Sequence, residues 1–453
     1  MMTSPLPAFL LAQRFPRDFT WGVATSAFQI EGAAAADGKG ESIWDRFCRA
    51  PGAIADASNG DVACDHYHRL DADLDLIAGL GVTAYRFSVS WPRVQPLGHG
   101  TWNEAGLRFY ERLVDGLQAR GISAHLTLNH WDLPQALQDE GGWGARETVH
   151  HFVDYARGVA RRLGSRCASI CTHNEPWVIA VLGHQTGVFA PGYKSRTLAL
   201  QVAHHLLLSH GLALQALRAD GCTARLGIVL NLTPVFPATD SEADREQARI
   251  DDGTSIRWYC DPLFHGRYPA DILDHYGADA PLVQPGDMTA IAQPLDFLGV
   301  NNYSRHMASA TGPWDVKLGG LALTEMGWEI YPAGLTGLLL RLQRDYQPRS
   351  MLITENGGAF PDPLQAGQVH DADRTQYLGD HIAAVADARD QGARVDGYMV
   401  WSLMDNFEWA SGYAKRFGIV HVDYQTQRRT PKDSALWYRG LLQQWRASAG
   451  EGN

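Results

Sequence analysis

Two glutamates in distant parts of the chain have neighbours that suit acid–base chemistry. Glu175 lies in residues 172–176, Thr-His-Asn-Glu-Pro, and Glu355 lies in residues 353–357, Ile-Thr-Glu-Asn-Gly. Each segment follows a short apolar run that is typical of a buried strand. Either motif alone is more often a turn than a site. As a pair at matching strand ends, however, two carboxyl groups are what cleavage of a glycosidic bond requires.

Polar and aromatic residues also end most of the other predicted strands. Gln, Asn, His and Glu supply the paired donors and acceptors that sugar hydroxyls need, and Trp supplies a flat partner for the apolar face of a pyranose. The carboxyl ends of parallel strands meet at one end of a barrel, so we expect one pocket for a carbohydrate. Its candidate residues are Gln29, Arg86, His130, Trp131, Asn174, Glu175, Tyr303, Glu355, Trp401, Glu408 and Trp409. Four other tryptophans have no such placement and are expected to be packing residues: Trp143, Trp177, Trp258 and Trp437.

These residues need a scaffold that gathers strand ends. Apolar runs of four to eight residues, typical of strands buried on both faces, alternate with helical patterns. Eight such units predict a parallel sheet that closes into a single (β/α)₈ TIM barrel, with a doubly wound open sheet as the alternative. The predicted strands begin near Phe19, Thr83, Ser123, Ala168, Arg225, Phe297, Met351 and Gly397. Long connections at 27–65, 172–197, 304–331 and 405–432 are expected on the catalytic face.

The helices between the strands show apolar stripes with identifiable ends. In residues 66–79, Leu70, Leu74 and Ile77 share one face, and three aspartates lie elsewhere. Asn103 is a predicted N-cap for a helix that Gly121 ends. Residues 204–217 and 372–389 show the same pattern.

Composition limits the number of domains, the partners and the cellular location that we expect. No linker or low-complexity tract divides the 453 residues, so we expect one catalytic domain, with residues 1–14 and 446–453 as peripheral tails. A net charge of −11 argues against a nucleic-acid partner, and no apolar run approaches the length of a membrane span. The six cysteines form no CxxC pair, which favours buried free thiols in a cytoplasmic protein. The histidine pairs lack a third ligand and no nucleotide motif occurs, so neither a metal nor a cofactor is predicted.

The motifs resemble those of a known family. Residues 172–176 and 353–357 are similar to the two signatures of glycoside hydrolase family 1, the β-glucosidases. So are residues 19–32, Phe-Thr-Trp-Gly-Val-Ala-Thr-Ser-Ala-Phe-Gln-Ile-Glu-Gly, and residues 401–409, Trp-Ser-Leu-Met-Asp-Asn-Phe-Glu-Trp. The similarity runs from about Phe15 to Tyr438. One departure is Asn302, where family members often have Tyr; Tyr303, which follows it, is retained.

The resemblance implies a role for each candidate residue. Glu355 would be the nucleophile, and Glu175 the general acid and then the general base. Arg86 and Tyr303 would contact the nucleophile, and Trp328 would help to form the aglycone subsite. The remaining candidates would hold the sugar, with Trp401 as its platform: Gln29, His130, Trp131, Asn174, Glu408 and Trp409.

A retaining β-glucosidase that acts on β-glucosides or oligosaccharides is therefore expected, with carboxyl groups about 5–5.5 Å apart. Activity on β-galactosides or β-fucosides and glycosyl transfer both stay open, and so does the oligomeric state. One alternative is a 6-phospho-β-glucosidase, although that branch offers Ser, Lys and Tyr where this chain keeps Glu408 and Trp409. The other is a non-catalytic sugar-binding relative, although such relatives usually lack one of the two glutamates.

Overall fold

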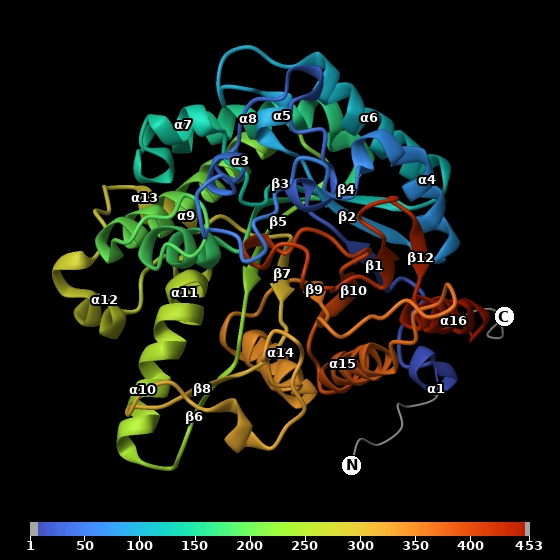
Figure 1. The fold of residues 1–453 in the computed structure, drawn as a ribbon. Coiled ribbons are helices and arrows are strands. Elements are labelled where there is room, and N and C mark those ends of the chain that lie inside the picture. Colours follow the sequence, from blue (N-terminus) through green and yellow to red (C-terminus); the bar gives the residue numbers. More distant parts are fainter. Residues whose placement is uncertain (1–7, 449–453) are drawn as a thin grey trace.

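A closed barrel of eight parallel strands lies at the centre of the computed structural model, which describes residues 8–448 (Figure 1). Neighbouring strands pair in the order β1, β2, β3, β4, β5, β7, β9 and β10, and β10 pairs again with β1. The predicted TIM barrel is confirmed, and each strand begins within two residues of its predicted start. The strands are β1 (Thr20–Ala24), β2 (Ala84–Ser88), β3 (Ser123–Asn129), β4 (Cys167–Asn174), β5 (Arg225–Asn231), β7 (Phe297–Asn301), β9 (Met351–Asn356) and β10 (Val395–Trp401).

Helices surround the barrel and cover the outer faces of its strands (Figure 1). Every residue of β2, β7 and β9 is buried, because one face of each strand packs in the barrel interior and the other packs under helices. This two-sided burial explains why the strands are nearly continuous apolar runs in the sequence. The larger helices are α4 (His66–Gly79), α6 (Glu104–Ala119), α8 (Glu147–Leu163), α9 (Arg196–Ala219), α11 (Trp258–His265), α14 (Pro332–Asp345), α15 (Ala372–Asp390) and α16 (Asp433–Ser448).

Helix α6 forms as its sequence predicts. The Asn103 side chain accepts a hydrogen bond from the backbone N–H of Ala105 at 3.2 Å, which caps the first turn. Its apolar stripe, which includes Leu107 and Leu113, is buried. Gly121 follows the helix with φ of +68°, a conformation that glycine adopts without strain.

Two helices differ from the sequence prediction. In α4, Asp73 is buried beside the apolar stripe, where it accepts hydrogen bonds from Arg429 Nε at 2.9 Å and is 2.8 Å from His66 Nδ1. Helix α9 begins eight residues before the predicted start at 204, because the Ser195 side chain caps it by accepting from the N–H of Leu198.

Shorter elements occupy the connections between the barrel units. They are α2 (Ala27–Ile30), α3 (Ile43–Phe47), α5 (Trp91–Val94), α7 (Gln135–Asp139), α10 (Glu242–Asp252), α12 (Ala270–Tyr276), α13 (Asp287–Ile291), and the paired short strands β6 (Val235–Pro237) with β8 (His306–Ala308) and β11 (Val420–Val422) with β12 (Arg429–Pro431). Across residues 8–448, no helix has both the length and the apolar composition that crossing a bilayer would need.

Part of the segment that we expected to be a peripheral tail is packed. Helix α1 (Ala8–Ala12) lies against α16 and buries Leu11 and Ala12 completely. Arg14 then donates hydrogen bonds to Asp387 and Asp390 at the end of α15. Residues 1–7 and 449–453 lie outside the described part of the chain.

The register of the strands brings the candidate residues to one mouth of the barrel. Ala24 at the end of β1 is level with Trp401 of β10 and Arg86 of β2. On the opposite side, Asn301 of β7 is level with Glu355 of β9. The long loops that follow these strands surround the same mouth.

Candidate active site

A cavity of about 530 Å³ opens at the carboxyl ends of the strands. Nine of the predicted site residues line it: His130, Trp131, Glu175, Tyr303, Trp328, Glu355, Trp401, Glu408 and Trp409. Residues from β3, β4, β7, β9 and β10, and from the loops after them, therefore share one pocket. Both predicted catalytic carboxyl groups are in its wall.

The other three predicted residues, Gln29, Asn174 and Arg86, lie behind the wall and are at most 1 % exposed. Asn174 accepts hydrogen bonds from Arg86 at 2.7 Å and from Asn301 Nδ2 at 3.1 Å. Gln29 donates to the Asn406 side chain and to the backbone oxygen of Phe407. Arg86 and Asn174 thus contact the lining residues Glu355 and His130 from behind, and Gln29 holds the segment that precedes Glu408.

Glu355, the penultimate residue of β9, is held by two donors. Arg86 donates to Oε1 at 2.5 Å, and the Tyr303 hydroxyl donates to Oε2 at 2.6 Å. Burial raises the pKa of Glu355 above its ordinary value, while Arg86 and Tyr303 oppose this rise by stabilising the carboxylate. Gly357 is required just beyond, because a Cβ there would lie 1.7 Å from the backbone oxygen of Trp401.

Glu175, directly after β4, has a different environment. Its side chain accepts one hydrogen bond, from Asn301 Nδ2 at 2.6 Å. Asn301 cannot reverse its amide freely, since its Oδ1 accepts from Thr354 at 2.7 Å. Burial and then the neighbouring charge of Glu355 raise the pKa of Glu175 to about 8. Glu355, which has two donors, is therefore better stabilised as a carboxylate than Glu175, which has one amide donor.

The network also fixes the tautomer of His130. Because Asn174 Oδ1 accepts two hydrogen bonds, Asn174 Nδ2 must donate to His130 Nε2, 3.1 Å away. Burial lowers the pKa of His130 well below its ordinary value, so the ring is neutral. Its proton then resides on Nδ1, which has no partner in the described structure and is free to donate to a ligand.

Glu408 brings a third carboxyl group to the pocket. Its Oε2 is buried and has no hydrogen-bond partner among residues 8–448. Burial and the charge of Glu355 raise the pKa of Glu408 to about 8. A ligand hydroxyl in the cavity would supply the hydrogen bond that this buried polar atom lacks.

Aromatic rings form much of the remaining wall. His130 is nearly parallel to Trp401 with ring centroids 5.8 Å apart, and Trp131 contacts Trp409 at 4.5 Å. Glu175, Trp131 and Trp409 all have φ between +48° and +81°, a conformation that costs non-glycine residues energy. The fold thus holds three pocket residues in strained backbone conformations.

The four packing predictions hold, but one is incomplete. Trp143 and Trp258 are buried, and Trp177 and Trp437 pack against the hydrophobic core while partly exposed. Trp177 also lines the cavity. Trp177 follows Glu175 by two residues, and that spacing was the available signal for a site role. Sequence reasoning also missed Phe189 and Trp314, which reach the cavity from long loops where no pattern marks them.

The described residues contain no cluster of three or more side chains that could hold a metal ion. What the site offers is a pair of carboxyl groups with unequal proton affinities, polar atoms without partners, and indole rings.

Comparisons with known proteins agree with this geometry. The model of "Glycosyl hydrolase family 1" matches residues 11–446. Beta-glucosidase A of Acetivibrio thermocellus is 46% identical over 439 residues, which cover 94% of this chain and 98% of that protein. A bifunctional beta-D-glucosidase/beta-D-fucosidase of Bifidobacterium breve is 43% identical over 457 residues, covering 94% and 98%.

Among solved structures, beta-glucosidase from Thermotoga maritima in complex with glucoimidazole superimposes with a TM-score of 0.92. It is 42% identical, and the match covers 96% of this chain and 99% of that one. The family match over residues 11–446 and the similarity to these relatives lead to one conclusion: the chain belongs to glycosyl hydrolase family 1.

Proposed function

We propose that this protein is a retaining β-glucosidase that releases terminal non-reducing β-D-glucosyl residues through a covalent glycosyl-enzyme. The observation that carries the proposal is the unequal environment of two glutamates in one cavity. Glu355 is held by Arg86 and Tyr303, and Glu175 has one amide donor. The names of the relatives support β-glucosides as the substrate class.

In the first step Glu355 attacks the anomeric carbon. The carboxylate must be ionised, and Arg86 and Tyr303 stabilise that form. Glu175, whose pKa is raised to about 8, donates its proton to the leaving glycosidic oxygen. The C1–O bond breaks, the aglycone leaves as a neutral alcohol, and glucose remains esterified to Glu355.

In the second step Glu175 changes from acid to base. The ester at Glu355 carries no charge, so the repulsion that helped to raise the pKa of Glu175 is gone. Glu175 then accepts a proton from a water molecule that attacks the anomeric carbon. The ester bond breaks, β-glucose leaves, and the enzyme regains its starting protonation state.

The sugar is held by the polar atoms that lack partners. We infer that His130 Nδ1 donates to the sugar and that Glu408 binds its 4- and 6-hydroxyls, because both groups line the cavity and lack partners in the described structure. Trp401 would lie under the ring, and Gln29 and Asn174 support these residues from behind. Because one relative is named for β-fucosidase activity as well, we include β-fucosides among the substrates to be tested.

The 6-phospho-β-glucosidase alternative is not favoured. An ionised Glu408 would repel a phosphate, but the raised pKa of this group makes that repulsion weaker near neutral pH. The stronger argument is the lack of a free cation. The described cavity wall contains one Arg or Lys, Arg305, and Glu329 pairs with it at 2.8 Å. Lys415 instead donates to the backbone oxygen of Glu325.

The deciding experiment compares kcat/KM for 4-nitrophenyl β-glucoside and its 6-phosphate. The proposal predicts efficient cleavage of the first and little of the second. Glu355→Gln should remove almost all of this activity, whereas the same change at Glu140, which is exposed on the surface, should leave it intact. Preference for the phosphorylated substrate, or an active Glu355→Gln variant, would contradict the proposal.

We further propose a cytoplasmic location and action on short β-linked oligosaccharides. All six cysteines are free thiols, four of them buried, which suits a reducing compartment.

A further inference from the structure

The loop that carries Glu408 and Trp409 is closed at its base by a buried ion pair. It leaves the barrel after β10 at Asp405 and returns at Arg416. Arg416 donates to Asp405 Oδ2 at 2.6 Å, and the N–H of Gly418 donates to Asp405 Oδ1 at 3.1 Å. The two ends of the loop are therefore joined directly.

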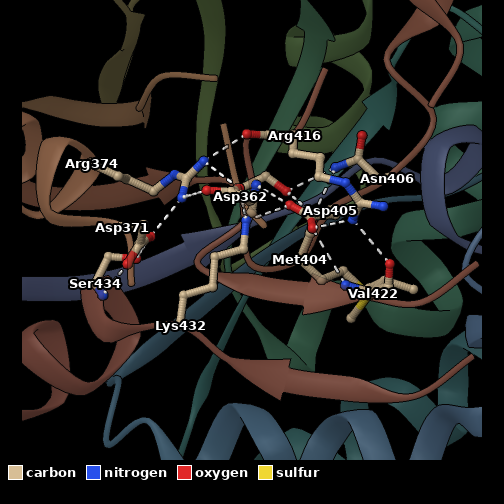
Figure 2. A network of polar contacts seen from close by, with 12 residues as sticks. Asp362, Asp371, Arg374, Met404, Asp405, Asn406, Arg416, Val422, Lys432 and Ser434 are labelled. Atoms are coloured by element: carbon tan, nitrogen blue, oxygen red, sulfur yellow. Dashed lines mark hydrogen bonds and ion pairs between the residues drawn. The ribbon is translucent and has the colours of Figure 1, made fainter. Parts of the chain in front are cut away.

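More charged side chains surround this junction (Figure 2). Lys432 donates to Asp405 Oδ1 at 2.7 Å and also to Asp362. Arg374 donates to Asp362 at 2.8 Å and to Asp371 at 2.6 Å. We call these residues the neck cluster: Asp362, Asp371, Arg374, Asp405, Arg416 and Lys432.

The neck cluster is balanced in charge and almost entirely buried. Three acidic side chains face three basic ones, and all except Arg416 have side chains at most 1 % exposed. Burial raises the pKa of Asp405, but Lys432 and Arg416 outweigh this effect, so the pKa lies below its ordinary value and the group stays ionised. A buried cluster of ion pairs is often less stabilising than apolar side chains of the same volume, but its directional contacts fix the relative positions of the segments that it joins.

The cluster connects the loops after the two strands nearest the nucleophile. Asp362 follows β9, and Arg374 also donates to the backbone oxygens of Gly358, after β9, and Arg416, after β10. Beyond the junction, Asn406 accepts from Gln29, and the N–H of Phe407 donates to the backbone oxygen of Gln29. Glu408 and Trp409 are thus held between the neck cluster and Gln29.

We propose that the neck cluster positions Glu408 toward the 4- and 6-hydroxyls of the sugar, with Asp405 and Arg416 as positioning residues for substrate recognition. This inference rests on the proposed β-glucosidase function. Neither residue lines the cavity, so each acts through the loop that it closes. Loss of either charge should loosen the loop, so that Glu408 no longer meets the 6-hydroxyl at a fixed distance.

The test uses two substrates that differ in that hydroxyl, 4-nitrophenyl β-glucoside and its 6-deoxy analogue. Wild-type enzyme should prefer the glucoside. Asp405→Asn should reduce the ratio of the two kcat/KM values by up to about tenfold, the effect of one lost hydrogen bond. The change should be mainly an increased KM for the glucoside, with kcat/KM for the analogue much less affected.

Asp287→Asn is the matched control. Asp287 is also buried, on α13, where it is paired with Arg146 and His204 rather than with the β10 loop. This variant should lower the melting temperature but leave the substrate ratio unchanged. The ratio therefore separates positioning from general destabilisation.

Arg416, which is 24 % exposed in its side chain, provides a second pair of variants that does not require a core replacement. Arg416→Met should lower the ratio of the two kcat/KM values as Asp405→Asn does, and Arg416→Lys should retain most of the wild-type ratio. The inference is overturned if wild-type enzyme cleaves the glucoside and its 6-deoxy analogue equally well. It is also overturned if Asp405→Asn and Arg416→Met, like the control, leave the ratio of the two kcat/KM values unchanged. If wild-type enzyme cleaves neither substrate, the proposed function itself is wrong.

Discussion

Glu175, Glu355 and Glu408 are identical side chains in three different surroundings within one cavity. Glu355 receives a guanidinium and a phenol hydroxyl, Glu175 receives one amide, and Glu408 Oε2 receives no donor in the described structure. The chemical role of each follows from these partners, because donors to a carboxylate favour its charged form. The residue type alone would not distinguish the three.

The two catalytic roles predict different products when azide replaces the missing group. In Glu355→Ala, azide should occupy the nucleophile's place and give an α-glycosyl azide. In Glu175→Ala, a substrate with a very good leaving group should still form the ester, and azide should then give the β-product. NMR of the products tests this, and the same anomer from both variants would refute the assignment.

The raised pKa of Glu175 predicts the alkaline limb of the pH profile. In the proposed mechanism the protonated form of Glu175 is the active one, so kcat/KM should fall as pH rises through about 8. Glu175→Gln, assayed on an activated aryl glucoside, should lose this limb. Glu408 has a similarly raised pKa, so Glu408→Gln is the matched control. If that variant loses the limb and Glu175→Gln keeps it, Glu408 is the titrating group.

Sequence reasoning identified the lining residues that are attached to recognisable strand ends. It could not distinguish residues in the wall, such as His130, from residues behind it, such as Asn174, because that depends on side-chain direction in the folded barrel. It also did not predict that Trp177, which packs against the core as expected, reaches the cavity as well.

At the scale of elements, loops supply much of the cavity wall on the side of Glu175. In the proposed mechanism Glu175 donates its proton to the aglycone oxygen, and the segment after it contributes Trp177, Val178, Leu182 and Phe189 to the cavity. The loop after β7 adds further apolar side chains, among them Met307, Trp314 and Trp328.

This apolar wall predicts a preference for apolar aglycones. Along a series from butyl to octyl β-glucoside, kcat/KM should rise by up to about fourfold for each methylene, since a buried CH₂ is worth about 0.8 kcal/mol. Trp177→Ala should flatten the series. Trp437→Ala, a similarly half-buried tryptophan on α16, should not. A flat series in the wild-type enzyme would show that the aglycone does not contact this wall.

The elements themselves were largely predictable because their signals are local. Apolar runs located the strands, and Asn103 located the start of α6. The burial of Asp73 in α4 was not predicted, because one of its partners, Arg429, lies 356 residues later in the chain. Long-range partners of this kind leave no local pattern.

At the scale of the whole molecule, barrel closure joins the two ends of the chain beside the pocket. β1 pairs with β10, so Gln29 from the first loop can hold Asn406 in the last one. The Tyr438 hydroxyl on α16 donates to the backbone oxygen of Gly22 in β1 at 3.1 Å. The eightfold alternation of strands and helices predicted this closure, whereas the neck cluster depends on contacts that only the closed barrel creates.

The central claim is that two glutamates act in turn on the same sugar, and the stereochemistry of the first product tests it most directly. Hydrolysis of an aryl β-glucoside can be followed by proton NMR, because the α- and β-anomers of free glucose have separate anomeric signals. Two successive inversions at C1 predict that β-glucose appears first and that α-glucose appears later, at the slow rate of mutarotation. Early appearance of α-glucose would contradict the double-displacement mechanism.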